Sequence, residues 1–148
     1  MRGLEGRKER QFDMTFNYKE TFDRFSFYFL TIFISPILFG VFMALYSMIA
    51  FQDSWSFGPT VLVVGIYSWP FFAFGAFPVS IYIDFSARTR DYPHWKKAVL
   101  YAGFGGLAGL LGSVILYNLY SMIFMLTFGL FGGLIHFFVL ALIKRFFK

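Results

Sequence analysis

The sequence predicts an all-α protein, a bundle of four transmembrane helices whose two termini and central loop face the cytoplasm. Composition is the first reason: 58% of the 148 residues are hydrophobic and 14% are charged, whereas soluble domains carry about 25% charged residues. The second is that the apolar residues form four long runs, at about residues 25–50, 60–83, 98–116 and 121–143. As a helix, each run can cross the roughly 30 Å hydrocarbon core of a bilayer.

The third reason is the position of the basic residues, which sets the topology. Six of the 13 Lys and Arg residues lie in residues 1–24, four in 84–97 and three in 144–148. The loops at 51–57 and 117–120 contain none. Because Lys and Arg beside transmembrane helices stay on the cytoplasmic side, we expect both termini and the 84–97 loop in the cytoplasm. The chain is then a multi-pass protein of the cell membrane.

The same charge pattern argues against nucleic-acid binding. The net charge is +5, but the basic residues flank apolar runs and form no stripe among polar residues. The sequence has no cysteine, which excludes disulfides, thiolate metal sites and cysteine nucleophiles. The expected partner of the chain is therefore the lipid bilayer, with no metal, cofactor or nucleic acid.

Residues 1–13 differ from the rest of the chain, because they are polar, mixed in charge and without apolar periodicity. One interpretation is a disordered cytoplasmic tail. The other is a mis-annotated leader, because Arg7–Arg10 can be encoded by a purine-rich run like a bacterial ribosome-binding site, with Met14 at a suitable spacing. We expect translation to begin at Met14, so that residues 14–148 form a single four-span membrane domain.

The first span, at about residues 25–50, carries no charge and would be about 39 Å long as a helix. This length exceeds the hydrocarbon core, so the helix should tilt or kink. Pro36 supplies a kink, because it has no N–H and leaves the carbonyl of Ile32 without its helical partner. Thr31 or Ser35 could partly compensate for that lost bond.

The second span, at about residues 60–83, contains Pro70 and Pro78, both in its cytoplasmic half. Proline removes a helical hydrogen bond and clashes with the preceding turn. Two prolines in one span predict either a bent helix or one that gives way to irregular structure near its end.

Small residues characterise the third span, at about 98–116, and recur in the fourth, at about 121–143. Small residues four positions apart let helix backbones approach closely, and the short turn at 117–120 makes these spans antiparallel neighbours. The same glycine-lined helices predict a homo-oligomer or a membrane-protein partner. The glycines expected at helix contacts are Gly105, Gly106, Gly109, Gly112, Gly129 and Gly133.

His136 is the first candidate functional residue. Apart from tyrosines, no other titratable side chain lies well inside an apolar span. Ionisable groups at such positions mark functional sites by default. The alternatives are a neutral histidine that is hydrogen-bonded between helices, and a histidine near the cytoplasmic interface.

Asp84 is the second candidate, with Ser80 one turn earlier on the same helix face. A carboxylate at a helix C-terminus opposes the helix dipole, so something should offset it. The offset could come from Arg88, from Arg90, or from a role of Asp84 as the cap of a following helix. Asp84 is then either a structural residue that fixes the loop or a group that binds a cation or polar substrate.

The segment Gly75-x-x-Pro78-Val79-Ser80-x-x-x-Asp84 precedes a basic loop. It resembles a motif in uncharacterised small four-span membrane proteins of Gram-positive bacteria. The resemblance implies a four-span fold and a membrane location, and it groups Pro78, Ser80 and Asp84 as a local structural unit. It implies no activity.

The sequence holds no constellation that indicates an enzyme, since no catalytic triad, HExxH motif or phosphate-binding glycine loop fits the topology. We therefore expect a non-enzymatic accessory or assembly component of the bacterial cytoplasmic membrane. The alternative is a small oligomeric transporter or channel with a path near Pro70, Pro78 and His136. Against it, no carboxylate lies deep in a span, where ion-coupled carriers keep one.

Overall fold

Helices make up all the regular structure in the computed structural model, which describes residues 18–51, 56–89, 91–115 and 121–146. Four of its helical segments are long and apolar enough to cross a membrane, which confirms the predicted all-α, four-span fold. The predicted leader or tail at 1–13 and the turn at 117–120 lie outside the described residues. The elements are α2 (Tyr18–Phe51), α3 (Phe57–Phe71), the π-helical turn η2 (Phe72–Ala76), α4 (Phe77–Phe85), α5 (His94–Ile115) and α6 (Met122–Phe146).

Hydrogen bonds to backbone carbonyls define both ends of the loop between α4 and α5. Helix α4 stops because Ser86 turns to an extended conformation with ψ of 129°, and the Thr89 hydroxyl donates to the carbonyl of Ile83 at 2.7 Å. Helix α5 starts at His94, where the carbonyl of Pro93 accepts from the next turn. The third span therefore begins four residues before the expected position 98.

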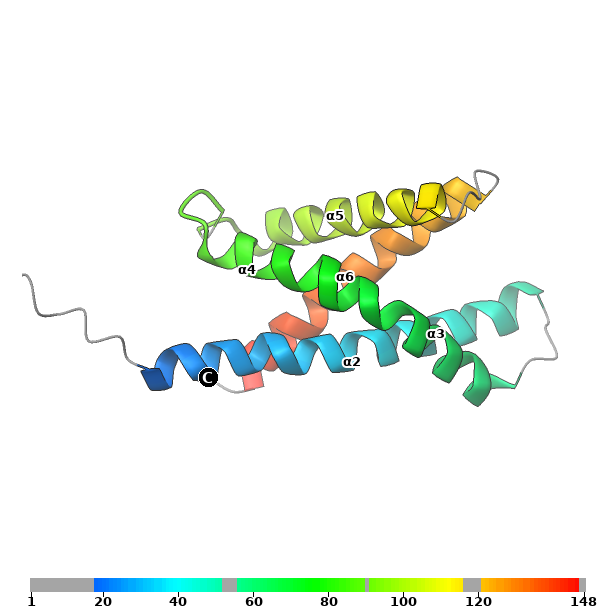
Figure 1. The fold of residues 1–148 in the computed structure, drawn as a ribbon, viewed down its shortest axis with the longest axis horizontal. Coiled ribbons are helices and arrows are strands. Elements are labelled where there is room, and N and C mark those ends of the chain that lie inside the picture. The colour runs from blue at the N-terminus through cyan, green and yellow to red at the C-terminus, as the bar shows by residue number, and fades with distance from the viewer. Residues whose placement is uncertain (1–17, 52–55, 90, 116–120, 147–148) are drawn as a thin grey trace, which may run out of the picture.

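The prolines bend the second span without interrupting its helix. Pro70 lies near the end of α3 and Pro78 at the start of α4, and η2 between them keeps the backbone helical. Of the two arrangements predicted for this span, the bent helix is the one observed (Figure 1). A π-helical turn adds a residue to one turn, and such turns occur often at functional sites.

Helix α2 runs through Pro36 as one continuous helix. The predicted compensation for the Ile32 carbonyl is not observed, because the two nearby hydroxyls bond elsewhere. Thr31 donates to the carbonyl of Phe27 at 2.6 Å, and the hydroxyl of Ser35 lies 3.0 Å from His136. Ser35 thus bonds across the bundle, whereas Thr31 bonds a carbonyl of its own helix that is not the one Pro36 leaves free.

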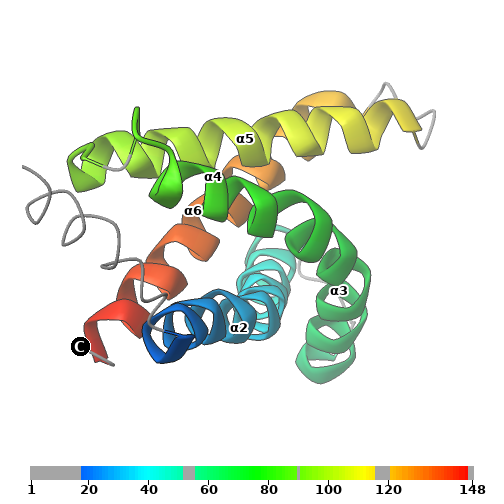
Figure 2. The same ribbon diagram turned by 60° about the vertical axis from the view of Figure 1, so that its left-hand side comes forward.

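The four spans exchange neighbours along the length of the bundle (Figures 1 and 2). At one end α3 lies beside α2 and α6 beside α5. Toward the other end, α4 approaches α5 and the last turns of α6 approach α2. We call this second end the basic end, because its described side chains include Arg88, Lys96, Lys97, Lys144 and Arg145, and we call the opposite end the apolar end.

The bundle buries several polar side chains among apolar ones and exposes many large apolar side chains, unlike a soluble protein. The side chains of Thr31, Ser35, Ser80, Ser113 and His136 are fully buried. Large apolar side chains such as Ile49 and Phe74 are about four-fifths exposed, at 81% each. This distribution fits a lipid surrounding, in which apolar surface costs nothing and polar side chains gain by hydrogen-bonding across helices.

Glycines bring α5 and α6 together in the most extensive helix contact of the structure. A Cβ added at Gly105 would overlap the carbonyl oxygen of Gly129, and one at Gly109 would overlap that of Met125. A Cβ at Gly133 would likewise overlap a backbone oxygen of α5. Backbone therefore packs on backbone, which only residues without a side chain permit.

The other expected glycines lie at looser contacts, and one unpredicted glycine has a similar role. Gly106 faces the side chains of Leu126 and Leu130, and Gly112 faces the ring of Phe71. Gly40, which the sequence did not single out, lets the carbonyl of Val61 approach α2. The α2–α3 pair therefore also depends on a glycine, though on a single one.

Gly129→Ala should destabilise the protein by about 1–3 kcal/mol, the usual cost of overpacking, because its new methyl group meets backbone that cannot move aside. Gly103→Ala is the matched control, since nothing lies within 4 Å of a Cβ at Gly103. Unfolding of both variants in detergent, followed by circular dichroism, measures the difference. Equal stability of the two variants would contradict the packing described here.

Candidate functional site

Two layers of polar side chains cross the half of the bundle toward the basic end, and each span contributes one residue to each layer. The ion-pair layer lies at the ends of the spans, and the histidine layer lies deeper. The ion-pair layer consists of Tyr28, Asp84, Lys97 and Lys144. The histidine layer consists of Ser35, Ser80, Tyr101 and His136.

Helical periodicity explains why the same spans supply both layers. Residues four, seven or eight positions apart lie on the same face of an α-helix. Ser80 and Asp84 are four residues apart, as are Lys97 and Tyr101, whereas His136 and Lys144 are eight apart. The two polar residues of each helix therefore point into the same interior, at different depths.

The carboxylate of Asp84 connects α4 to the three other spans. Its Oδ1 accepts a hydrogen bond from Lys97 Nζ at 3.2 Å. Its Oδ2 accepts from the hydroxyl of Tyr28 at 2.7 Å and from Lys144 Nζ. Lys144 also donates to the Tyr28 hydroxyl at 3.1 Å, and its ammonium lies 4.7 Å from the centroid of the Tyr28 ring.

The ion pairs of Asp84 differ from those that the sequence predicted. Arg88 was one of three predicted ways to offset the charge of Asp84, but α4 ends at Phe85, so Arg88 is no longer one helical turn away on the same face. Its side chain is exposed and makes no ion pair with Asp84. Arg90 lies outside the described residues. Lysines from α5 and α6 make the ion pairs instead.

His136 lies between two serines at the crossing of the spans. Its Nδ1 lies 3.0 Å from Ser35 Oγ and its Nε2 lies 2.9 Å from Ser80 Oγ. Its side chain is 1% exposed. The ring centroid of His136 lies 5.8 Å from that of Phe72 in η2 and 6.0 Å from that of Tyr101. Both ring nitrogens are thus used for contacts between helices.

The hydrogen bonds around His136 fix its tautomer. A hydroxyl has one proton, and that of Ser80 is donated to the carbonyl of Ala76 at 2.7 Å. Toward His136, Ser80 can then only accept, so Nε2 must carry the imidazole proton. In a neutral ring Nδ1 is left as the acceptor, and the Ser35 hydroxyl donates to it. One unbroken chain of donors runs from α2 through α6 to α4.

The space between the two layers is filled by apolar side chains, so the layers are separate. Ile83, Phe137 and Leu140 pack with the rings of Tyr28 and Tyr101 in one buried cluster. The hydroxyl of Tyr101 is buried and makes no hydrogen bond in the part of the chain that the structure describes. It is the one polar group of the histidine layer that lacks a partner there.

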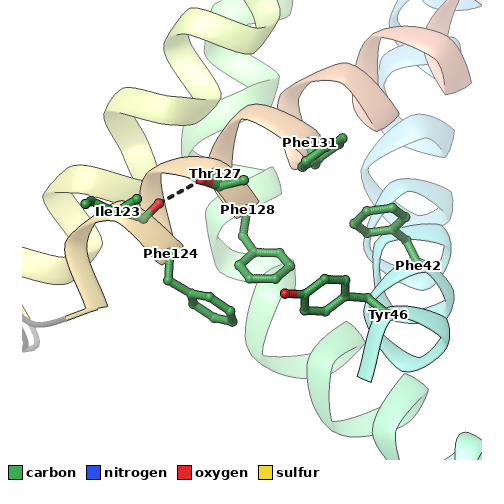
Figure 3. A pocket seen from close by; sticks show the side chains of 7 residues that line it. All are labelled: Phe42, Tyr46, Ile123, Phe124, Thr127, Phe128 and Phe131. Atoms are coloured by element: carbon green, nitrogen blue, oxygen red, sulfur yellow. Dashed lines mark hydrogen bonds between the residues drawn. The ribbon is translucent and has the colours of Figure 1, made fainter. Parts of the chain in front are cut away.

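The cavity toward the apolar end is an apolar crevice of about 390 Å³ between α2 and α6 (Figure 3). Its lining residues with polar side chains are Tyr46 and Thr127, and Thr127 donates to the carbonyl of Ile123 at 2.8 Å. No charged side chain lines the crevice, and no cluster of three or more metal-ligating side chains occurs among the described residues. The lining residues are Phe42, Tyr46, Ile123, Phe124, Thr127, Phe128 and Phe131.

The sequence singled out Ser80, Asp84 and His136 but missed the residues that bind them. Tyr28, Lys97 and Lys144 have the residue types and positions of ordinary headgroup anchors, which conceals their ion-pair role. Ser35 did carry a signal, because Tyr28, Thr31 and Ser35 recur on one face of α2.

No family model matches this chain, and no curated protein or solved structure is significantly similar to it. The polar layers therefore have to be interpreted from their own geometry.

Lys144→Gln should destabilise the protein by about 1–3 kcal/mol, the range for lost hydrogen bonds to a charged group, because Lys97 still pairs with Asp84. The variant removes the bonds that Lys144 makes to both Asp84 and Tyr28. Arg88→Gln removes the same charge at the same end and should change stability by less than about 0.5 kcal/mol. Unfolding in detergent compares them, and a larger loss for Arg88→Gln would favour the local ion pair predicted from the sequence.

The tautomer of His136 is testable by ¹⁵N nuclear magnetic resonance of protein labelled at histidine and reconstituted in bilayers. We expect a protonated Nε2 and an unprotonated Nδ1 at neutral pH, because the Ser80 proton is held by Ala76. The variant His94→Gln removes the signal of the other histidine. A protonated Nδ1 in the remaining signal would contradict the proposed direction of the hydrogen bonds.

Proposed function

We propose that this integral membrane protein is a non-enzymatic accessory or assembly component of a bacterial cytoplasmic membrane, with both termini and the 84–97 loop in the cytoplasm. The observation that carries the proposal is the use of Asp84. Its carboxylate is bound by α2, α5 and α6, as expected for a group that holds helices together. The motif around Ser80 and Asp84 and the charge pattern of the loops support the bacterial origin and the orientation.

The second polar group supports the same interpretation. A catalytic or transport site needs polar groups that face a space able to hold a substrate. Both ring nitrogens of His136 instead form hydrogen bonds with Ser35 and Ser80. The crevice at the apolar end has room, but no charged group lines it. Among the described residues, the two polar layers and this crevice thus lie in different halves of the bundle.

The glycines bear on how partners would associate. Gly105, Gly109, Gly129 and Gly133 are occupied by the contact between α5 and α6. A homo-oligomer or a membrane-protein partner would therefore use another face of the bundle. A homo-oligomer or a membrane-protein partner remains part of the proposal, but these four glycines are not proposed as its interface.

A small oligomeric transporter or channel is the second candidate, and one observation favours it. The π-helical turn between Pro70 and Pro78 brings Phe72 against the ring of His136. π-Helical turns are frequent at functional sites, and this one lies beside a buried ionisable group. A path past His136 would require the histidine layer to open.

Flux measurements in liposomes separate the two candidates. For the accessory component we expect no proton or solute flux above that of protein-free liposomes, in wild type or in His136→Ala, because the histidine layer is closed. Asp84→Asn should behave likewise if the reconstituted protein stays folded. Flux in wild type that is lost in His136→Ala would overturn the first candidate and establish the second.

The accessory role also predicts that the protein has a membrane-protein partner. Affinity purification of the full chain from native membranes in mild detergent should return a membrane protein in a fixed stoichiometric ratio. A monomer that co-purifies with no protein and conducts nothing would contradict both candidates.

A further inference from the structure

The ion-pair layer carries more positive than negative charge. Lys97 and Lys144 share the single carboxylate of Asp84, so one unit of positive charge is left over. The side chain of Lys144 is 35% exposed, whereas that of Asp84 is 16% exposed. The side chain of Lys97 is 18% exposed, so the positive charge of the layer is most accessible at Lys144.

Hydrogen-bond donors are also left over in this layer. Two ammonium groups carry six N–H donors. Three of these are used, by Lys97 on Asp84 and by Lys144 on Asp84 and on Tyr28. The remaining three donors have no protein acceptor among the described residues, and they belong to two groups that are held close together by the same carboxylate.

The layer lies at the ends of the apolar spans, where lipid headgroups are expected. Asp84 is the second-last residue of α4, Lys97 lies in the first turn of α5, and Lys144 lies in the last turn of α6. Other cations add to the positive electrostatic potential at this end. Among the side chains that the structure describes there, Arg88, Lys96 and Arg145 are exposed, and Asp91 is the one further acid.

We propose that Lys97 and Lys144 form a binding site for the phosphate group of an anionic lipid headgroup at the basic end of the bundle. Ammonium groups bind phosphate oxygens through charge-assisted hydrogen bonds, and basic pockets between transmembrane helices bind anionic headgroups. Asp84 holds the two lysines in place and leaves them one net positive charge. The site follows from the ion-pair geometry and does not depend on the proposed accessory role.

Lys97→Gln is the decisive variant, because it removes the excess charge without leaving Asp84 unpaired. Lys144 and Tyr28 still bind the carboxylate, and glutamine can donate to its Oδ1. Lys96→Gln is the matched control, since it removes the same charge one residue away. Lys96 is exposed and contacts only the rings of Tyr92 and Trp95 in the described structure.

Native mass spectrometry of the full chain in detergent, titrated with phosphatidylglycerol or phosphatidylcholine, measures binding. Wild type should bind phosphatidylglycerol at least fivefold more tightly than phosphatidylcholine. Lys97→Gln should weaken phosphatidylglycerol binding about fivefold, as expected for one basic residue at about 1 kcal/mol. Lys96→Gln should stay within about twofold of wild type on the same scale, and Lys97→Arg should restore binding.

Three results would overturn the site: no preference for phosphatidylglycerol, equal weakening by Lys96→Gln and Lys97→Gln, or failure of Lys97→Arg to bind. Circular dichroism confirms that each variant is folded before it is compared. Inorganic phosphate is the second arm. If millimolar phosphate displaces phosphatidylglycerol from wild type, the same two lysines bind a soluble phosphate compound. If it does not, the lipid is the ligand.

Discussion

The carboxylate of Asp84 is the interaction on which the arrangement of the four spans depends. A carboxylate costs about 2.5–3.5 kcal/mol at the centre of a membrane helix on insertion scales, and its position at the end of α4 lowers that cost. Tyr28, Lys97 and Lys144 bind it from the other three spans. Because each contact is directional, a shift of any one helix by a turn would remove at least one of the contacts to Asp84. The carboxylate thus sets the relative depth of all four helices.

The relative depth of the helices does not set the distance between them. Glycine residues determine that distance. Apolar side chains gain little by leaving lipid for protein, so helices in a bilayer associate through close packing and hydrogen bonds. Gly105, Gly109 and Gly129 let the backbones of α5 and α6 touch, which maximises dispersion contacts. Oblique crossing then becomes possible, because α6 can leave α5 toward α2 once the glycine contact ends. Ser35 and Ser80 bind His136 where this crossing occurs.

The sequence predicted the four helical spans well because the length of an apolar run reports directly on the thickness of the bilayer. It also identified Ser80, Asp84 and His136, since a polar residue in an apolar run is conspicuous. It failed on their partners for two physical reasons. A lysine at the end of a span has the same local pattern whether it meets water or a carboxylate from another helix. The choice of Arg88 relied on helical spacing beyond Asp84, although the second span was predicted to end near residue 83 and α4 does end at Phe85.

The two ends of the bundle are held by different forces, and this difference has mechanical consequences. At the basic end, four spans share one set of ion pairs. At the apolar end, α2 and α6 meet through rings such as Tyr46 and Phe128, whose centroids are 5.5 Å apart, around a crevice of about 390 Å³. Weakly packed regions open at lower free energy than well-bonded ones. The hairpins α2–α3 and α5–α6 should therefore separate first at the apolar end. The histidine layer is where such a separation would have to stop, because beyond it each span is bonded to Asp84. His136 thus lies at the boundary between the ion-paired half of the bundle and the half that contains the crevice.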